Sequence, residues 1–157
     1  MIDTRTRVLE VLQQTHVMSL GTVDPGGVWV ADVIFLHDDD LNIYWMSAPD
    51  SRHSRAVLES GRAAGTITYS TKSKEPNLGI QFEGAAERLD GVRFDLIIKH
   101  WAKRGHAAPE VSRALELLDG DRWYKLVPTR IELTDEEHFG FDRQTVRLGE
   151  EGSDSGE

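Results

Sequence analysis

The sequence predicts an α+β fold in which an antiparallel, barrel-like sheet of six or seven strands is flanked by helices. Three observations lead to this class. Short runs rich in β-branched and aromatic residues are separated by turn-forming residues. The elements follow the order helix, three strands, helix, two strands, two helices and two strands. The 157 residues, 39% of them hydrophobic, fit one domain, which we place at residues 1–148.

The first third of the chain begins with an amphipathic helix and continues as a meander. Residues 4–14 carry an apolar stripe of Val8, Leu9, Val11 and Leu12 at helical spacing. Strands are then predicted at 16–23, 28–36 and 41–47, with Asp-Pro-Gly-Gly and His-Asp-Asp-Asp as the two breaks. Breaks this short join antiparallel neighbours.

The rest of the chain alternates between helix and strand in the same manner. Ser51 is a candidate N-cap for a helix, and Pro128 predicts an edge position or a bulge in the strand that contains it. The further predicted elements are strands at 62–70 and 78–89, helices within 91–105 and 108–120, a strand at 121–133 and a final apolar patch at 139–148. Residues 149–157 contain no apolar side chain and are predicted to form a disordered acidic tail.

Composition excludes several classes of function. The formal net charge of −9 argues against nucleic acid or an anionic membrane as the main partner. The chain has no cysteine, so disulfides, thiolate catalysis and cysteine-ligated metals are excluded. No apolar run approaches the ~20 residues of a membrane span, and the N-terminus lacks the core of a signal peptide. We therefore expect a cytoplasmic protein.

Basic residues gather at the start of the helix that follows Ser51. Arg52, His53 and Arg55 lie in its first turn, where the helix dipole makes a cation unfavourable by about 0.3–1 kcal/mol. One interpretation is an anion held by the helix end and these side chains together. The other is a solvated surface helix in which Arg52 pairs with Asp50 and Arg55 pairs with Glu59.

Other chemistry has little support in the sequence. The six histidines show no metal-ligand spacing, and no serine-hydrolase, Walker or dinucleotide-binding motif is present, so no metal site is predicted. Three of the four tryptophans, Trp29, Trp45 and Trp123, fall in predicted strands. Such a ring can stack on a planar ligand, although packing in the core is the more frequent role.

The order of these motifs resembles a known family. LGTVDPGG, VWVADVIFLHDDDLNIYWMS, the Ser-Arg-His helix, GRAAGTI, GIQFEGAAERL and YKLVPTRIEL follow one another over about residues 6–148. The chain is similar to the flavin-binding split β-barrel proteins related to pyridoxamine 5′-phosphate oxidase, and most of all to a branch of small uncharacterised bacterial members. The resemblance implies a split β-barrel and a homodimer whose second chain completes the site.

The resemblance also assigns roles to residues. It implies that Ser51, Arg52 and His53 hold the phosphate of flavin mononucleotide (FMN). The ring would lie along the second and third strands, and Gln81 would lie nearby. Trp123 and Lys125 of the other subunit would close the site. The strand positions that correspond to the ring-binding segments are Asp32, Val33, Ile34, Tyr44, Trp45, Met46 and Ser47.

Departures from the family pattern narrow the expected activity. Leu78 and Gly79 stand where the oxidase has an arginine–glutamine pair, and the terminal FGFDRQTVRL lacks its Arg-x-His motif. We therefore expect an FMN-dependent oxidoreductase that acts on an unidentified small molecule other than pyridoxamine phosphate. The alternatives are a cofactor-binding or sensing module with haem or the deazaflavin F420, and a cofactor-free interaction domain.

Overall fold

A computed structural model describes residues 2–149 and confirms the predicted α+β class with its antiparallel barrel. The predicted acidic tail, apart from Gly149, lies outside the described residues. In chain order the elements are α1 (Thr4–Gln14), β1 (Val17–Asp24), β2 (Gly27–His37), β3 (Ile43–Ser47), α2 (Arg52–Ser60), β4 (Arg62–Thr68), β5 (Leu78–Arg88), α3 (Phe94–Lys103), a 3₁₀ turn (Val111–Arg113), α4 (Ala114–Leu118), β6 (Arg122–Asp135), α5 (Glu136–Phe139) and β7 (Gln144–Arg147).

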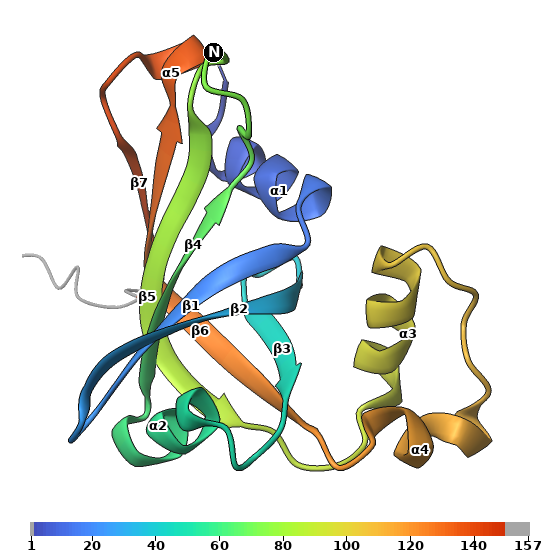
Figure 1. Cartoon of the computed structure of the whole chain (residues 1–157). Helices are drawn as coiled ribbons and strands as arrows, with labels where there is room; N and C mark the ends of the chain where they lie inside the picture. Colours follow the sequence, from blue (N-terminus) through green and yellow to red (C-terminus); the bar gives the residue numbers. More distant parts are fainter. Residues whose placement is uncertain (1, 150–157) are drawn as a thin grey trace, which may run out of the picture.

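Six strands close into the barrel, and a seventh extends it (Figure 1). The strand order is β3-β2-β1-β4-β5-β6, and pairing of β3 with β6 completes the ring, while β7 adds to the outer side of β6. The N-terminal part of β6 pairs with β3 from Arg122 to Leu126, and its C-terminal part pairs with β7 from Arg130 to Leu133. All seven strands run antiparallel to their neighbours.

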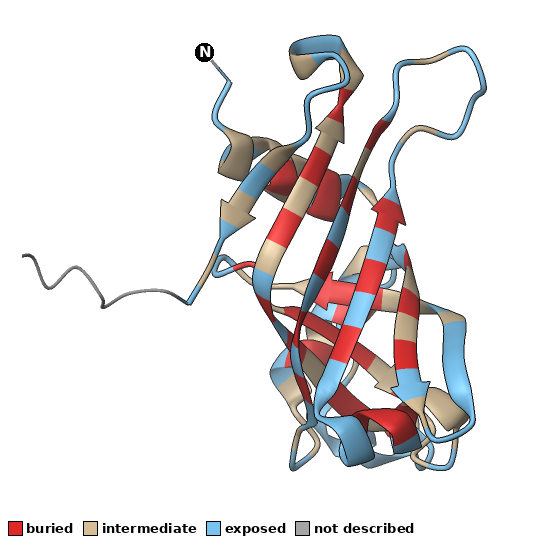
Figure 2. Cartoon of the chain, turned by 90° about the vertical axis from the view of Figure 1, so that its left-hand side faces the viewer, coloured by how far each residue is buried: buried red, intermediate tan, exposed pale blue. Residues whose placement is uncertain are grey.

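Alternating side chains separate the inside of the barrel from its outer face. Along β4 and β5 buried residues alternate with exposed ones, which gives the banded strands of Figure 2. The interior holds one continuous core that also includes the apolar face of α1. Its largest fully buried side chains include Trp45, Tyr124 and Phe35.

Two glycines allow backbones and rings to approach closely inside the barrel. The Phe82 ring lies where a Cβ on Gly65 would stand, only 2.6 Å from the nearest ring carbon. A Cβ on Gly84 would lie 2.0 Å from the carbonyl oxygen of Val127, next to the register shift between β5 and β6. Pro128 pairs with Gly84 at this shift, so the predicted bulge is confirmed.

A second, smaller core joins α3 and α4 to one side of the barrel (Figure 1). Leu36, Tyr44 and Trp123 of the sheet pack against Leu96 and Ile97 of α3. Lys103 at the end of α3 reaches the barrel, where its Nζ donates to the carbonyls of Leu12 at 3.3 Å and Phe35 at 3.1 Å. Burial lowers the pKa of this ammonium group to about 8. Two carbonyls and the Phe35 ring thus hold the cation against the barrel.

The C-terminal helices differ from the prediction. The second predicted helix shrinks to a 3₁₀ turn and five residues of α4. Ala114 and Leu118 of its apolar stripe are buried, but Val111 and Leu115 are 68% and 74% exposed. The four-residue α5 was not predicted, and β7 covers only part of the final apolar patch. Among the described helices, none has both the length and the apolar character needed to cross a membrane.

Replacing Gly84 with alanine tests the bulge. The new Cβ would overlap the Val127 carbonyl, so we expect the Gly84→Ala variant to lose about 3 kcal/mol of unfolding free energy in urea denaturation. Gly21→Ala is the matched control, because its Cβ would meet its nearest neighbour at an ordinary 3.6 Å. Equal stability of the two variants would contradict the steric account.

Candidate functional site

The start of α2 is fixed by Ser51, which caps the helix. Its backbone is extended, with φ −63° and ψ 152°, and its Oγ accepts from the N–H of Ser54 at 3.3 Å. The same hydroxyl donates to the carbonyl of Ala48 at 2.8 Å, which ties the helix start to the end of β3. The N–H groups of Arg52 and His53 belong to the helix end that has no intrahelical acceptor. A donor-rich helix start therefore lies at the end of β3 (Figure 1).

His53 joins the end of β3 to this cap. Its Nε2 lies 2.9 Å from the hydroxyl of Ser47 and 3.3 Å from that of Ser51. The Ser51 hydroxyl in turn lies 2.7 Å from the fully buried hydroxyl of Ser54. Burial lowers the pKa of His53 below its ordinary value. At neutral pH this imidazole is therefore uncharged, and the three serines and the histidine form a polar cluster at the mouth of the barrel.

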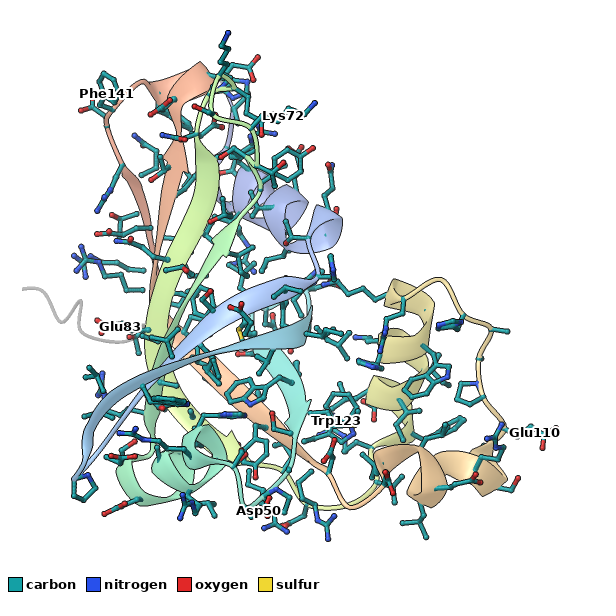
Figure 3. All side chains as sticks on the ribbon, viewed as in Figure 1. Asp50, Lys72, Glu83, Glu110, Trp123 and Phe141 are labelled. Carbon is teal, nitrogen blue, oxygen red and sulfur yellow. The ribbon has the colours of Figure 1, made fainter. Side chains whose placement is uncertain are left out.

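Arg52 is held by the β1–β2 hairpin. Its Nε donates to Asp24 Oδ2 at 2.9 Å and its Nη2 to Asp24 Oδ1 at 3.3 Å, while the guanidinium carbon lies 4.8 Å from the centre of the Trp29 ring. The hydrogen bond from Arg52 is the main reason why the pKa of Asp24 is lowered. The carboxylate partner of Arg52 is thus Asp24 and not Asp50, which corrects the surface-helix interpretation; Asp50 is exposed in the turn before α2 (Figure 3).

Several predicted ring-binding residues lie inside the protein. Trp45 is fully buried in the barrel core and Trp123 is 1% exposed in the second core, so both rings have the packing role that is more frequent for tryptophan. Trp123 lies between the sheet and α3 in Figure 3. Lys125 pairs with Tyr44 across β3 and β6 of one chain, with its Nζ 5.7 Å from the Tyr44 ring. Whether Trp123 and Lys125 close the site of a second chain stays a prediction.

The remaining predicted residues are less enclosed. Val33 packs against the barrel core and Met46 against the second core, and both are half-buried, as is Ile34. Asp32 accepts from the hydroxyl of Ser19 at 2.7 Å on the outer face of the sheet. Val33 and Asp32 thus lie on opposite faces of β2, so the predicted ring-binding residues do not share one face of the sheet.

A shallow groove runs across the outer face of the barrel. Its volume is about 580 Å³, and small residues such as Gly21 and Ala64 form its floor. Gln81 lines it and donates to Glu132 at 2.6 Å. Asp32 and Gln81 lie on one row of paired residues, Asp32–Ser19–Thr66–Gln81, which spans β2, β1, β4 and β5. Three strand spacings of about 4.8 Å separate them by roughly 14 Å.

The hairpin beside this groove is apolar and exposed. Val28 is 81%, Val30 64% and Val23 50% exposed. These side chains form a continuous apolar patch with the groove floor on the same face of the sheet. In residues 2–149, no group of three or more His, Asp and Glu side chains has the arrangement of a metal site.

Sequence reasoning missed Asp24 as a functional candidate, and it considered Trp29 only as a ring that stacks on a planar ligand or packs in the core. Asp24 was interpreted as a turn residue and Trp29 as a strand residue, and neither was linked to a helix more than 20 positions later. The signal that could have found them is the hairpin itself, because its short turn places Asp24 opposite Gly27 and close to Trp29. Which helix the hairpin tip would touch depended on barrel closure.

Comparison with known proteins agrees with the fold. Residues 4–135 match the model of the family described as pyridoxamine 5′-phosphate oxidase. The UPF0306 protein YhbP of Escherichia coli O157:H7 is 25% identical over 154 residues, which are 98% of this chain and 99% of YhbP. The solved structure of the conserved hypothetical protein Rv2991 from Mycobacterium tuberculosis has a TM-score of 0.75 at 14% identity. The match covers 97% of this chain and 94% of the Rv2991 chain.

A haem-binding protein from Mycobacterium smegmatis has a similar structure. Its TM-score is 0.66 at 17% identity, and the match covers 94% of this chain and 59% of that protein. At these identities the solved structures show a shared fold, whereas the family model spans most of the chain.

The polar cluster predicts that the pKa of His53 depends on whether an anion is bound beside it. We expect the His53 imidazole to titrate below its ordinary value of 6.5 in NMR spectra, because burial disfavours the imidazolium. Inorganic phosphate bound at the α2 start would stabilise the charged form, so we expect it to raise this pKa. The His53→Asn variant assigns the resonance. A pKa that saturating phosphate leaves unchanged would show that no anion binds beside His53.

Proposed function

Because the chain belongs to the pyridoxamine 5′-phosphate oxidase family, we propose that it binds FMN and acts as a homodimeric, FMN-dependent oxidoreductase on a small molecule. The observation that carries the proposal is the donor set at the start of α2, where Ser51 and His53 meet the end of β3 and Arg52 is held by Asp24 of the β1–β2 hairpin. This segment occupies the position at which the family resemblance expects phosphate-binding residues.

The donor set fits a phosphate group. A guanidinium supplies directional N–H donors, hydroxyls supply adaptable ones, and a helix end supplies backbone N–H groups. Arg52 would carry most of the charge interaction, because His53 is neutral at physiological pH. Ser51 would keep its cap, with its hydroxyl proton on the carbonyl of Ala48, and would act by holding the N–H groups of the helix start in place. Bound FMN would supply hydride-transfer chemistry that the chain itself lacks.

The strand residues would act as walls for the flavin ring. Ile34 and Met46 are half-buried on the outer faces of β2 and β3, so each keeps some apolar surface for a planar ligand. Val33 faces the barrel core and would contribute through its backbone. Trp45 is fully enclosed, so it would contribute through its backbone and by fixing the position of β3. Their role is to orient the ring and to exclude water from it.

The substrate would differ from pyridoxamine phosphate. Leu78 is buried in the barrel and Gly79 carries no side chain, so neither can donate to a substrate as the arginine–glutamine pair of the oxidase would. A Cβ on Gly79 would lie 2.7 Å from the carbonyl oxygen of Ile67. This position is therefore constrained by packing of β4 against β5 rather than by a ligand.

Haem is the second candidate cofactor, and the similarity to the haem-binding mycobacterial protein favours it. Haem requires an axial ligand. His53 shares its Nε2 with two serines, and His100 is buried between Trp101 and Trp123. Visible absorption of the purified protein separates flavin, deazaflavin and haem.

Titration with FMN tests the proposal. We expect cofactor-stripped protein to bind FMN and to bind riboflavin about ten- to a hundredfold more weakly, because riboflavin lacks the phosphate that Arg52 contacts. Arg52→Ala should remove most of this preference. Arg104→Ala is the matched control, since it removes the same charge at an exposed residue after α3, away from the start of α2. Equal binding of FMN and riboflavin by the wild type would refute the phosphate site.

The homodimer is proposed to form across the outer groove. A large cation on its floor would prevent a second copy from packing there, so Ala64→Arg should convert a dimer into a monomer in sedimentation analysis and weaken FMN binding. Gln13→Arg on the exposed face of α1 adds the same charge elsewhere and should leave the dimer intact. A monomeric wild type would contradict this assembly.

A further inference from the structure

We infer that Asp24 and Trp29 are positioning residues that hold the Arg52 guanidinium with one edge open to the phosphate. The inference rests on the proposed function, because it concerns how the same anion site is prepared before its ligand arrives. It assigns a role in cofactor binding to the tip of the β1–β2 hairpin, which lies outside the motif that suggested the site.

The geometry of the ion pair leaves part of the guanidinium available. Arg52 has five N–H donors in a planar fork. Asp24 takes the edge formed by Nε and Nη2, with oxygens at 2.9 Å and 3.3 Å. Asp24 makes no hydrogen bond with the two N–H groups of Nη1, which lie on the other edge of the planar guanidinium. An anion can therefore bind Arg52 while Asp24 keeps its own contact.

Trp29 restricts the remaining freedom of the side chain. The guanidinium carbon lies over the indole ring, 4.8 Å from its centre, so the ring fixes the plane of the fork. Asp24 fixes its rotation within that plane. With both contacts in place, the orientation of the free edge is set by the hairpin rather than by the ligand.

Asp24 is itself fixed by the turn that follows it. Its Oδ1 accepts from the N–H of Gly26 at 2.8 Å, and Gly27 has a φ of +120° that only glycine adopts readily. A Cβ on Gly26 would lie 3.1 Å from Oδ1 of Asp24 and 3.4 Å from Nη2 of Arg52. The two glycines thus let the turn fold tightly around the ion pair.

If Asp24 competed with the phosphate instead of orienting Arg52, replacing Asp24 would change phosphate binding in the opposite direction. A carboxylate that competed with the phosphate for Arg52 would weaken binding, and its removal would strengthen it. A carboxylate that orients Arg52 spares the ligand the ordering of a long side chain. The use of a single edge by Asp24 favours orientation, since a competitor would have to occupy the donors that the ligand needs.

The experiment compares FMN with riboflavin, because their ratio of dissociation constants isolates the phosphate contact. We expect Asp24→Asn to reduce the preference for FMN by about two- to tenfold. This factor corresponds to the free energy of ordering one long side chain. Trp29→Leu should reduce it as well, whereas Trp29→Phe should preserve it. General damage to the fold would weaken both ligands equally and leave their ratio unchanged.

Asp50→Asn is the matched control. It removes the same charge beside the start of α2, but Asp50 is exposed and is not the carboxylate that pairs with Arg52. Its preference for FMN should equal or exceed that of the wild type. Circular dichroism of each variant checks that the fold is kept.

The outcomes separate the two proposals. A wild type without preference for FMN overturns both the phosphate site and its positioning residues. A wild type that prefers FMN, together with an undiminished preference in Asp24→Asn and Trp29→Leu, overturns the positioning role alone. A stronger preference in Asp24→Asn shows that Asp24 competes with the ligand and also overturns it.

Discussion

The pairing of β3 with β6 is the constraint on which the rest of the structure depends. β6 is the longest described strand, and it serves three neighbours: β3 along its first part, β5 along most of its length and β7 near its end. One straight strand cannot do this, and the register shift at Gly84 and Pro128 provides the necessary bend. Because the Val127 carbonyl lies where a side chain at position 84 would stand, the closed barrel requires glycine there. Closure thus depends on backbone packing as much as on apolar burial.

Barrel closure also determines what surrounds the start of α2. It fixes the end of β3, so the Ser47 hydroxyl lies beside His53, and it places the β1–β2 hairpin where Asp24 and Trp29 reach Arg52. Three segments that are distant in the sequence therefore meet at one mouth of the barrel. The outer groove is set by the same registers, but exposed lining residues such as Ala64 and Gln81 lie on the face of the sheet opposite to the core.

Local sequence signals were sufficient for most elements and insufficient for the partners within the site. Alternation and turn residues predict β1 to β5, and Ser51 predicts the α2 start, because these features depend on neighbours within a few positions. Val111 and Leu115 follow a helical stripe equally well, yet they are exposed, whereas Ala114 and Leu118 of the same stripe are buried in the second core. The Asp24–Arg52 pair could not be predicted from spacing, since only the closed barrel brings residues 28 positions apart into contact. Burial of Trp45 and Trp123 likewise depends on which face of β3 and β6 turns inward.

The ion pair changes how the basic helix start should be understood. Cations beside a helix N-terminus are unfavourable, and the sequence alone left two explanations open, an external anion and ion pairs within the helix surface. Asp24 supplies a negative charge from within the chain, so Arg52 is compensated in the absence of any ligand. Charge imbalance is therefore not what argues for a phosphate at this position. The argument rests instead on donors that the chain leaves available: the edge of Arg52 that Asp24 does not use and the backbone N–H groups at the start of α2. A phosphate group has several acceptor oxygens and would satisfy these donors better than water can. Its second negative charge would stay uncompensated while His53 is neutral, and protonation of His53 would compensate it.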